Sequence, residues 1–156
     1  MALPSTVAIA LAGPPLALLG AVGSAIGTAI AGSAGVPVAA EDPMQRGRIL
    51  MLAALPMTQT FYGFIFMFMA FTHVLSLGSS LSLGGAYAMV ALGLVVGLIE
   101  LFSAIWQGKV CKTAIAMLIK TRGAIMGMGL IMAVYVELFA ILGMAFGIMA
   151  LFTWVR

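Results

Sequence analysis

The sequence predicts an all-α integral membrane protein, built from four transmembrane helices that form two tandem helical hairpins. Of its 156 residues, 64% are hydrophobic and only 7% are charged, and the mean hydropathy is +1.25. A soluble domain carries about a quarter charged residues, so this chain has too few to cover a water-facing surface. Four long apolar segments, separated by short connections, account for nearly all of its length. The bilayer is therefore the expected solvent.

The four apolar segments are long enough to cross a membrane. They cover roughly residues 5–36, 46–77, 83–118 and 122–154. Each exceeds the ~20 residues needed to cross the hydrocarbon core, so we expect the helices to tilt or to project beyond it. Because the connections are short, consecutive helices must lie antiparallel. The chain then divides into a first hairpin over residues 1–78 and a second over residues 79–156.

The first segment is rich in small residues at helical spacing. One row is Gly23, Gly27, Ala31 and Gly35, and the row beside it is Gly20, Ser24, Thr28 and Gly32. In lipid, small residues let helix backbones approach closely. We therefore expect this helix to pack side by side with copies of itself in a tight inner ring. Because no basic residue precedes Arg46, the segment lacks the n-region of a secretory signal and is interpreted as the first transmembrane helix.

The second segment carries oxygen-bearing groups next to a proline. They are spaced i, i+3, i+4 and i+7 and so share one helix face: Leu55, Thr58, Gln59 and Tyr62. Pro56 lacks an N–H, so it should kink the helix and free a backbone carbonyl, which at membrane depth needs a partner such as a cation. The alternative is structural: Thr58 can bond a helix carbonyl, and the other side chains can pack or join helices.

A single carboxylate lies in the middle of the fourth segment. No other charge lies within a dozen residues of Glu137. An ionisable group at membrane depth is costly, which makes it a candidate functional residue. Gln107 in the third segment adds an amide oxygen at similar depth if the second hairpin closes normally. Carboxylate, carbonyl and hydroxyl oxygens are the ligands that hard cations prefer, so the pattern predicts a site for a small cation or a proton at Glu137.

The two hairpins resemble each other in sequence. Ser24–Thr28 in the first segment matches Ser103–Gln107 in the third. Aligning Gln59 with Glu137 also aligns Phe61 with Phe139 and Phe68 with Phe146. A duplication of this kind leaves an amide in the first hairpin where the second has a carboxylate. It halves the number of chargeable sites per pair of hairpins.

The basic residues indicate an orientation in the membrane. Apart from Arg156, they lie around the connections after the first and third segments: Arg46, Arg48, Lys109, Lys112, Lys120 and Arg122. By the positive-inside rule, loops 37–45 and 119–123 face the cytoplasm and both termini face outside. No basic domain surface suits nucleic acid. The single cysteine, Cys111, excludes a disulfide framework, and the single histidine, His73, is expected at the membrane interface rather than on a metal.

These features together resemble the rotor-ring proteolipids (the c-type proteolipids) of V/A-type ATPases, and among them the sodium-translocating bacterial subunit K. The resemblance covers nearly the whole chain. It includes the duplicated hairpin, the glycine-rich first helix and three motifs. These are Leu-Pro-x-Thr-Gln-x-x-Tyr-Gly-Phe at 55–64, Gln-Gly-Lys-Val at 107–110 and Val-Glu-x-x-Ala-Ile-Leu-Gly at 136–143.

The resemblance implies an ion site with defined ligands. In this family the glutamate, here Glu137, binds the ion, and in sodium-type members further oxygen ligands help. The matching groups in this sequence are the Leu55 carbonyl and the side chains of Thr58, Gln59, Gln107 and Tyr62. Proton-type relatives usually lack the Thr-Gln pair, so its presence implies Na⁺ as the bound ion. A ring that carries H⁺ at Glu137 alone is the alternative.

Glu100 departs from the pattern of the sodium-type relatives, in which the resemblance implies a small residue. It lies seven residues before Gln107 and so on about the same helix face, about 10 Å nearer the outside. One hypothesis makes Glu100 an accessory carboxylate that helps ions in an outer half-channel or titrates as a second site. The alternative is a structural carboxyl that is protonated or in contact with water.

The resemblance also implies a function and partners. The chain would be a rotor-ring subunit of a V-type ATPase or ATP synthase in the cell (plasma) membrane, without a catalytic site or an organic cofactor. Its partners would be identical copies, a stator subunit with a basic residue, lipid, and a central stalk at loops Glu41–Arg48 and Lys120–Gly123. Two other classes are disfavoured. A small multidrug or cation exporter needs an aromatic-lined cavity, whereas the first segment has no aromatic residue, and a purely structural pore leaves Glu137 unexplained.

Overall fold

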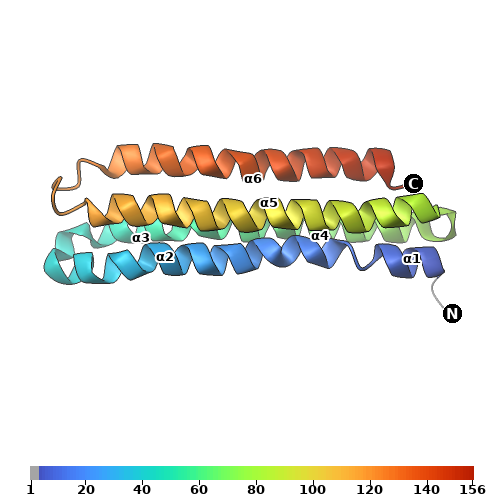
Figure 1. Cartoon of the computed structure of the whole chain (residues 1–156), viewed down its shortest axis with the longest axis horizontal. Coiled ribbons are helices and arrows are strands. Elements are labelled where there is room, and N and C mark those ends of the chain that lie inside the picture. Colours follow the sequence, from blue (N-terminus) through green and yellow to red (C-terminus); the bar gives the residue numbers. More distant parts are fainter. Residues whose placement is uncertain (1–3) are drawn as a thin grey trace.

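The computed structural model describes residues 4–156 as a bundle of long helical stretches that run along one axis (Figure 1). The first stretch comprises α1 (Ser5–Ala10), η1 (Pro14–Leu18) and α2 (Leu19–Glu41). The second comprises η2 (Pro43–Gln45), α3 (Arg46–Ala54), η3 (Leu55–Met57), α4 (Thr58–Leu77) and η4 (Gly78–Ser80). The third is α5 (Leu83–Ala116) and the fourth is α6 (Met126–Trp154).

All four stretches are long and apolar enough to cross a membrane. The predicted all-α, four-span membrane fold is therefore confirmed. Helix α1 and the C-terminal end of α6 lie at the same end of the bundle, and the connections between α2 and α3 and between α5 and α6 lie at the other (Figure 1). The predicted outside position of Met1 falls outside the described residues.

The first span is not the single helix predicted over residues 5–36. Helix α1 ends at Ala10, and a 3₁₀ segment begins at Pro14. Pro14 and Pro15 have no N–H to donate, so regular α-helical hydrogen bonding cannot continue through them. The chain resumes a regular helix only at Leu19.

The predicted loop over residues 37–45 was wrong in its first half. Helix α2 continues through Pro37 and ends at Glu41. The side chain of Val38 is buried in an apolar cluster that also contains Ile49 and Leu52. This packing offsets the hydrogen bond that Pro37 cannot make.

The connection between α5 and α6 is longer than predicted. Helix α6 begins at Met126, not at residue 122. The φ angles of Arg122 and Gly123 are 51° and 85°, which is the left-handed region that a right-handed helix cannot include. A Cβ at Gly123 would also lie 2.5 Å from the guanidinium carbon of Arg48. The helix predicted over residues 122–154 therefore lacks its first turn.

Helices α2 and α5 run parallel and pack backbone to backbone. A Cβ at Gly23 would meet the backbone of Leu101, and one at Gly27 would meet the backbone of Ala104. Gly108 in turn lies against the backbone of Gly27. The row with Gly23 and Gly27 in the first span is therefore used inside the chain, and the packing of this helix beside copies of itself in a ring stays a prediction. Helix α5 is the counterpart of that helix within the chain, and it packs beside α2 through the contacts at Gly23, Gly27 and Gly108.

Two apolar clusters fill the bundle on either side of a polar layer. Large buried members of the first, near α1 and the end of α6, include Phe66, Val74, Met89, Val96 and Leu151. Those of the second, near the other end, include Ile49, Leu52, Ile115 and Leu118. Between the clusters lie the buried polar side chains of Gln59, Glu100, Ser103 and Gln107. This layer positions the candidate site in the middle of the bundle.

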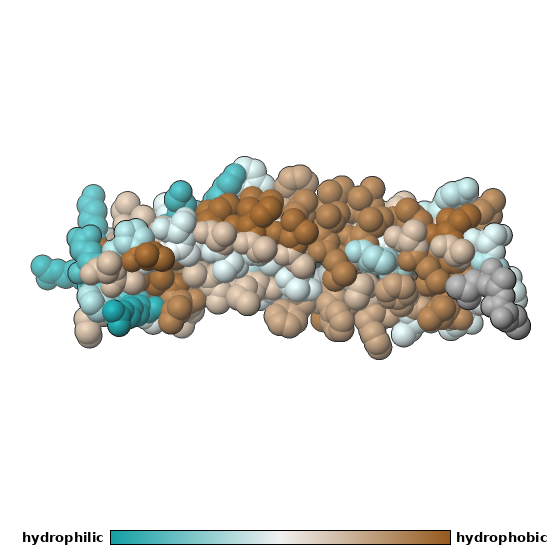
Figure 2. All heavy atoms as spheres, turned by 90° about the horizontal axis from the view of Figure 1, so that it is seen from below, coloured by the Kyte–Doolittle hydropathy of each residue, from teal (hydrophilic) through white to brown (hydrophobic). Residues whose placement is uncertain are grey.

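The surface of the bundle is mostly apolar, as expected for a protein in contact with lipid (Figure 2). Hydrophilic atoms gather at the end where α2 and α3 connect, on the left in both views. The exposed Arg46 and Arg48 lie in the first turn of α3, and the exposed Lys120 lies in the α5–α6 connection, at this end. His73 near the opposite end lies 2.9 Å through Nε2 from the Val155 carbonyl and edge-on to Phe152, so it ties α4 to the end of α6.

Candidate ion-binding site

Glu137 on α6 is held by side chains from two other helices. The Tyr62 hydroxyl on α4 donates a hydrogen bond to Glu137 Oε1 at 2.8 Å. The Gln107 amide on α5 donates from Nε2 to Glu137 Oε2 at 3.2 Å. Both carboxyl oxygens thus have a partner, and the three helices meet at one point.

A chain of amide and hydroxyl groups extends from Glu137 into the bundle. Gln59 Nε2 donates to Gln107 Oε1 at 2.9 Å and to Ser103 Oγ at 3.2 Å. Ser103 Oγ donates to the Val136 carbonyl at 3.1 Å, and Gln107 Nε2 lies 3.2 Å from the Ala133 carbonyl. The network therefore fixes both amides against the backbone of α6.

Ser103 is a site residue that the sequence pattern did not identify. It lies four residues before Gln107, on the same face of α5, and is 7% exposed. Its position one helical turn from a predicted ligand was the signal that could have identified it. In the sequence, Ser103 stands out only as a marker of the repeat.

The proline in the second span shapes the remaining part of the site. Pro56 lies in the 3₁₀ turn η3, which separates α3 from α4, so the regular α-helix is interrupted at the proline for which a kink was predicted. The Thr58 hydroxyl donates to the Leu55 carbonyl at 3.0 Å and lies 3.3 Å from Gln59 Oε1. The structural alternative for Thr58, a bond to a helix carbonyl, is thus observed. The same geometry places two oxygens, from Leu55 and Thr58, beside the amide of Gln59.

The structure thus brings together the six residues that the sequence predicts for the ion site: Leu55, Thr58, Gln59, Tyr62, Gln107 and Glu137. Turning an amide by 180° about its last bond exchanges its NH₂ group for its oxygen. Gln59 and Gln107 can therefore either hold the carboxylate by hydrogen bonds or offer oxygens to a cation. With a single carboxylate, bound Na⁺ leaves the site without net charge.

Glu137 is placed differently from the other polar groups of the layer. Gln59 and Gln107 have no exposed surface, whereas Glu137 is partly exposed and its neighbours Leu138 and Phe139 are exposed. The carboxylate therefore lies at the edge of the bundle, on the last helix, α6. A group approaching from the membrane side can reach it without unfolding the bundle.

Glu100 lies in the polar layer but outside the network. Its side chain has no exposed surface, and neither carboxyl oxygen has a hydrogen-bond partner among residues 4–156. A Cβ at Gly20 would lie 2.8 Å from Glu100 Cβ, which places Glu100 against α2. Burial without any exposed surface does not favour a role in an outer half-channel.

Replacing Glu100 with Gln should leave ion binding and transport unchanged. A buried charge without a partner costs several kcal/mol, so the neutral carboxyl, which Gln imitates in shape, is the form expected here. The check is sodium uptake by the complete ATPase in proteoliposomes at several pH values. A changed transport rate or a shifted pH profile in Glu100→Gln would restore the hypothesis of a second titrating site.

Comparison with known proteins identifies the family. Two parts of the chain, residues 12–70 and 90–150, match the family of the ATP synthase C subunit. The chain belongs to this family. The two matched parts correspond to the two hairpins, so the predicted duplication is supported by the family pattern as well as by the short sequence matches.

Two relatives place the chain among the rotor subunits of V/A-type ATPases. The V-type sodium ATPase subunit K of Enterococcus hirae is 36% identical over 122 residues, which cover 78% of this chain and 76% of the relative. The A-type ATP synthase subunit K of Methanocaldococcus jannaschii is 35% identical over 130 residues, 83% of this chain, which spans only 55% of that relative's length. The chain is thus a non-catalytic, multi-pass rotor subunit, and the exporter and structural-pore alternatives are excluded.

Proposed function

We propose that this rotor subunit assembles into a ring and carries Na⁺ at Glu137. The observation that supports the proposal is the convergence of the Glu137 carboxylate, the Tyr62 hydroxyl and the Gln107 amide, with Leu55 and Thr58 oxygens beside Gln59. A proton needs only one carboxylate oxygen. Na⁺ needs several oxygens around it, and this site offers carbonyl, hydroxyl and amide oxygens in addition to the carboxylate.

The position of Glu137 suits a rotary cycle. With Na⁺ bound, the site is neutral and can pass through lipid at low cost. When the ring turns Glu137 toward the stator, a basic residue of the stator competes for the carboxylate and releases the ion. The partly exposed carboxylate is accessible to such a residue, whereas the buried amides stay in place and restore the site.

The ends of the bundle suit the other partners. The exposed basic residues near η2 and in the α5–α6 connection support a cytoplasmic position for that end, by the positive-inside rule. We propose that the central stalk docks there, on loops Glu41–Arg48 and Lys120–Gly123, and that both termini face outside. The protein then acts in the cell membrane, where ATP hydrolysis or synthesis on other subunits drives or uses the rotation.

Sodium should protect Glu137 from carbodiimide labelling at constant pH. Carbodiimides modify the protonated carboxyl, and bound Na⁺ keeps the carboxylate ionised and occupied. The measurement is the extent of labelling of the purified ring over a sodium titration, with potassium as the control cation. If only raising the pH protects Glu137, the ring carries H⁺, and Thr58 and Gln59 are packing residues.

A further inference from the structure

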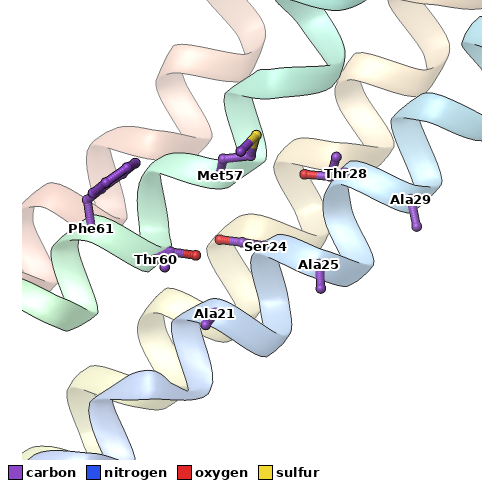
Figure 3. A pocket seen from close by; sticks show the side chains of 8 residues that line it. All are labelled: Ala21, Ser24, Ala25, Thr28, Ala29, Met57, Thr60 and Phe61. Carbon is purple, nitrogen blue, oxygen red and sulfur yellow. The ribbon is translucent and has the colours of Figure 1, made fainter.

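Helix α2 carries a second face of small residues that nothing in the described chain covers. Ala25 and Ala29 on this face are exposed. Together with α4 they line a groove of about 490 Å³. Figure 3 shows the groove and its lining residues, which are Ala21, Ser24, Ala25, Thr28, Ala29, Met57, Thr60 and Phe61.

Two polar groups in the groove lack partners. Ser24 is 5% exposed, and neither Ser24 Oγ nor Thr28 Oγ1 has a hydrogen-bond partner among residues 4–156. Both hydroxyls point across the groove toward α4 (Figure 3). Both hydroxyl oxygens are buried by the chain itself, so the surface that the groove offers to a partner is mainly apolar and includes Ala25, Ala29, Met57 and Phe61.

The internal repeat indicates what fills the groove. A constant shift of 79 residues relates Ser24–Thr28 to Ser103–Gln107. Inside the chain, Gly27 of α2 packs against Ala104 and Gly108 of α5. The same shift carries Gly27 to Trp106, and it relates Ala104 and Gly108 to Ala25 and Ala29.

We propose that Trp106 of one copy of this chain lies in the groove over Ala25 and Ala29 of the next copy. In a ring whose hairpins are all evenly spaced, the rotation that carries α2 onto α5 within a chain also carries α5 onto α2 of the neighbouring chain. The contact between copies then repeats the contact within the chain, at the same depth in the membrane. The inference rests on the proposed ring and names the surfaces that close it.

The two surfaces are complementary in shape and chemistry. Trp106 is 54% exposed and its neighbour on the same face, Phe102, is 55% exposed, so α5 presents large aromatic side chains where α2 presents alanines. The Lys109 ammonium lies 3.7 Å from the centre of the Trp106 ring and covers one of its faces, which leaves the other for the groove.

Chemical crosslinking of cysteine variants tests this arrangement. In a Cys111→Ala background, Ala25→Cys is combined with Trp106→Cys, and the assembled ring is treated with a short bis-thiosulfonate crosslinker. A crosslinker is needed because the indole holds the helices farther apart than a disulfide spans. We expect a ladder of dimers and higher multimers on denaturing gels, and only monomer from each single variant. The matched control is Ala25→Cys with Tyr135→Cys, which is exposed on α6 and should also give monomer.

Each outcome decides the proposal. Rings that assemble but give no ladder with the Ala25 and Trp106 pair would overturn the proposal. A ladder with the control pair would also overturn it, as would lipid bound in the groove of the assembled ring. If the Trp106→Cys chain does not assemble, the pair Ala21→Cys and Ile99→Cys tests the same contact. Within the chain, Gly20 packs beside Glu100, and the shift of 79 residues relates Gly20 to Ile99 and Glu100 to Ala21. A wild-type chain that forms no high-mass oligomer would instead refute the proposed ring itself.

Discussion

Replacing Glu137 with Gln should abolish sodium binding and ATP-driven sodium transport. Glutamine has nearly the same shape and can still accept a hydrogen bond from Tyr62, so the local structure should persist. It removes the only charge that compensates Na⁺ in the site. The loss of a counter-charge in the low-dielectric membrane is worth about 3 kcal/mol or more, which corresponds to a fall in affinity of at least about a hundredfold.

The measurement is sodium uptake by the reconstituted ATPase together with sodium binding to the isolated ring. Glu100→Gln is the matched control, because it is the same substitution of a carboxyl in the same polar layer and should have no effect. The ring must be shown to assemble in both variants by its mass. Transport that persists in Glu137→Gln would mean that the ion does not use this carboxylate.

Most of the candidate site could be predicted from local sequence. The spacing of Thr58, Gln59 and Tyr62 put three polar groups on one face of a helix, and the isolation of Glu137 in an apolar segment identified a functional group. These inferences depend only on helical periodicity and on the cost of charge in lipid. Ser103 was missed because a serine hydroxyl in a transmembrane helix can form its hydrogen bond with many groups, including carbonyls of its own helix. Only its tertiary partners, Gln59 and Val136, show its role.

The packing of α2 could not be predicted in the same way. A row of small residues indicates a close contact between helices but does not identify the helix that makes the contact. In this chain the row Gly23–Gly27 meets α5 of the same polypeptide, and the face with Ala25 and Ala29 is the one left uncovered. Choosing between these faces requires the register of α5 against α2, which is a tertiary property.

The ends of the helices also depended on tertiary structure. Pro37 and the nearby Gly35 suggested a break, yet the helix continues because Val38 has an apolar pocket to fill. The opposite error occurred at residue 122, where the sequence offered no break other than Gly123. The left-handed φ at Arg122 arises from closing the hairpin and cannot be deduced from the residue itself, since arginine ordinarily avoids that region.

Replacing Gly27 with Val should disrupt the chain more than any other single change in the small-residue row. A Cβ at this position would meet the backbone carbonyl of Ala104 and would lie 2.8 Å from Pro56 Cβ. Neither neighbour can rotate away, because one is backbone and the other is a ring within the turn η3. The helices must separate, at a cost of about 3 kcal/mol or more, out of a total stability of about 5–15 kcal/mol for a typical domain.

The displacement should also reach the ion site. Pro56 belongs to the turn that sets the Leu55 carbonyl and Thr58 beside Gln59, so any ring that still forms should bind Na⁺ more weakly. The measurements are the yield of ring, its dissociation temperature in detergent, and sodium protection against carbodiimide. Gly127→Ala is the control, since a Cβ there meets nothing within 4 Å and alanine favours a helix by about 1 kcal/mol. A Gly27→Val ring as stable as the control would show that α2 and α5 are not in backbone contact at this position, and the register on which the contact between copies depends would have to be redrawn.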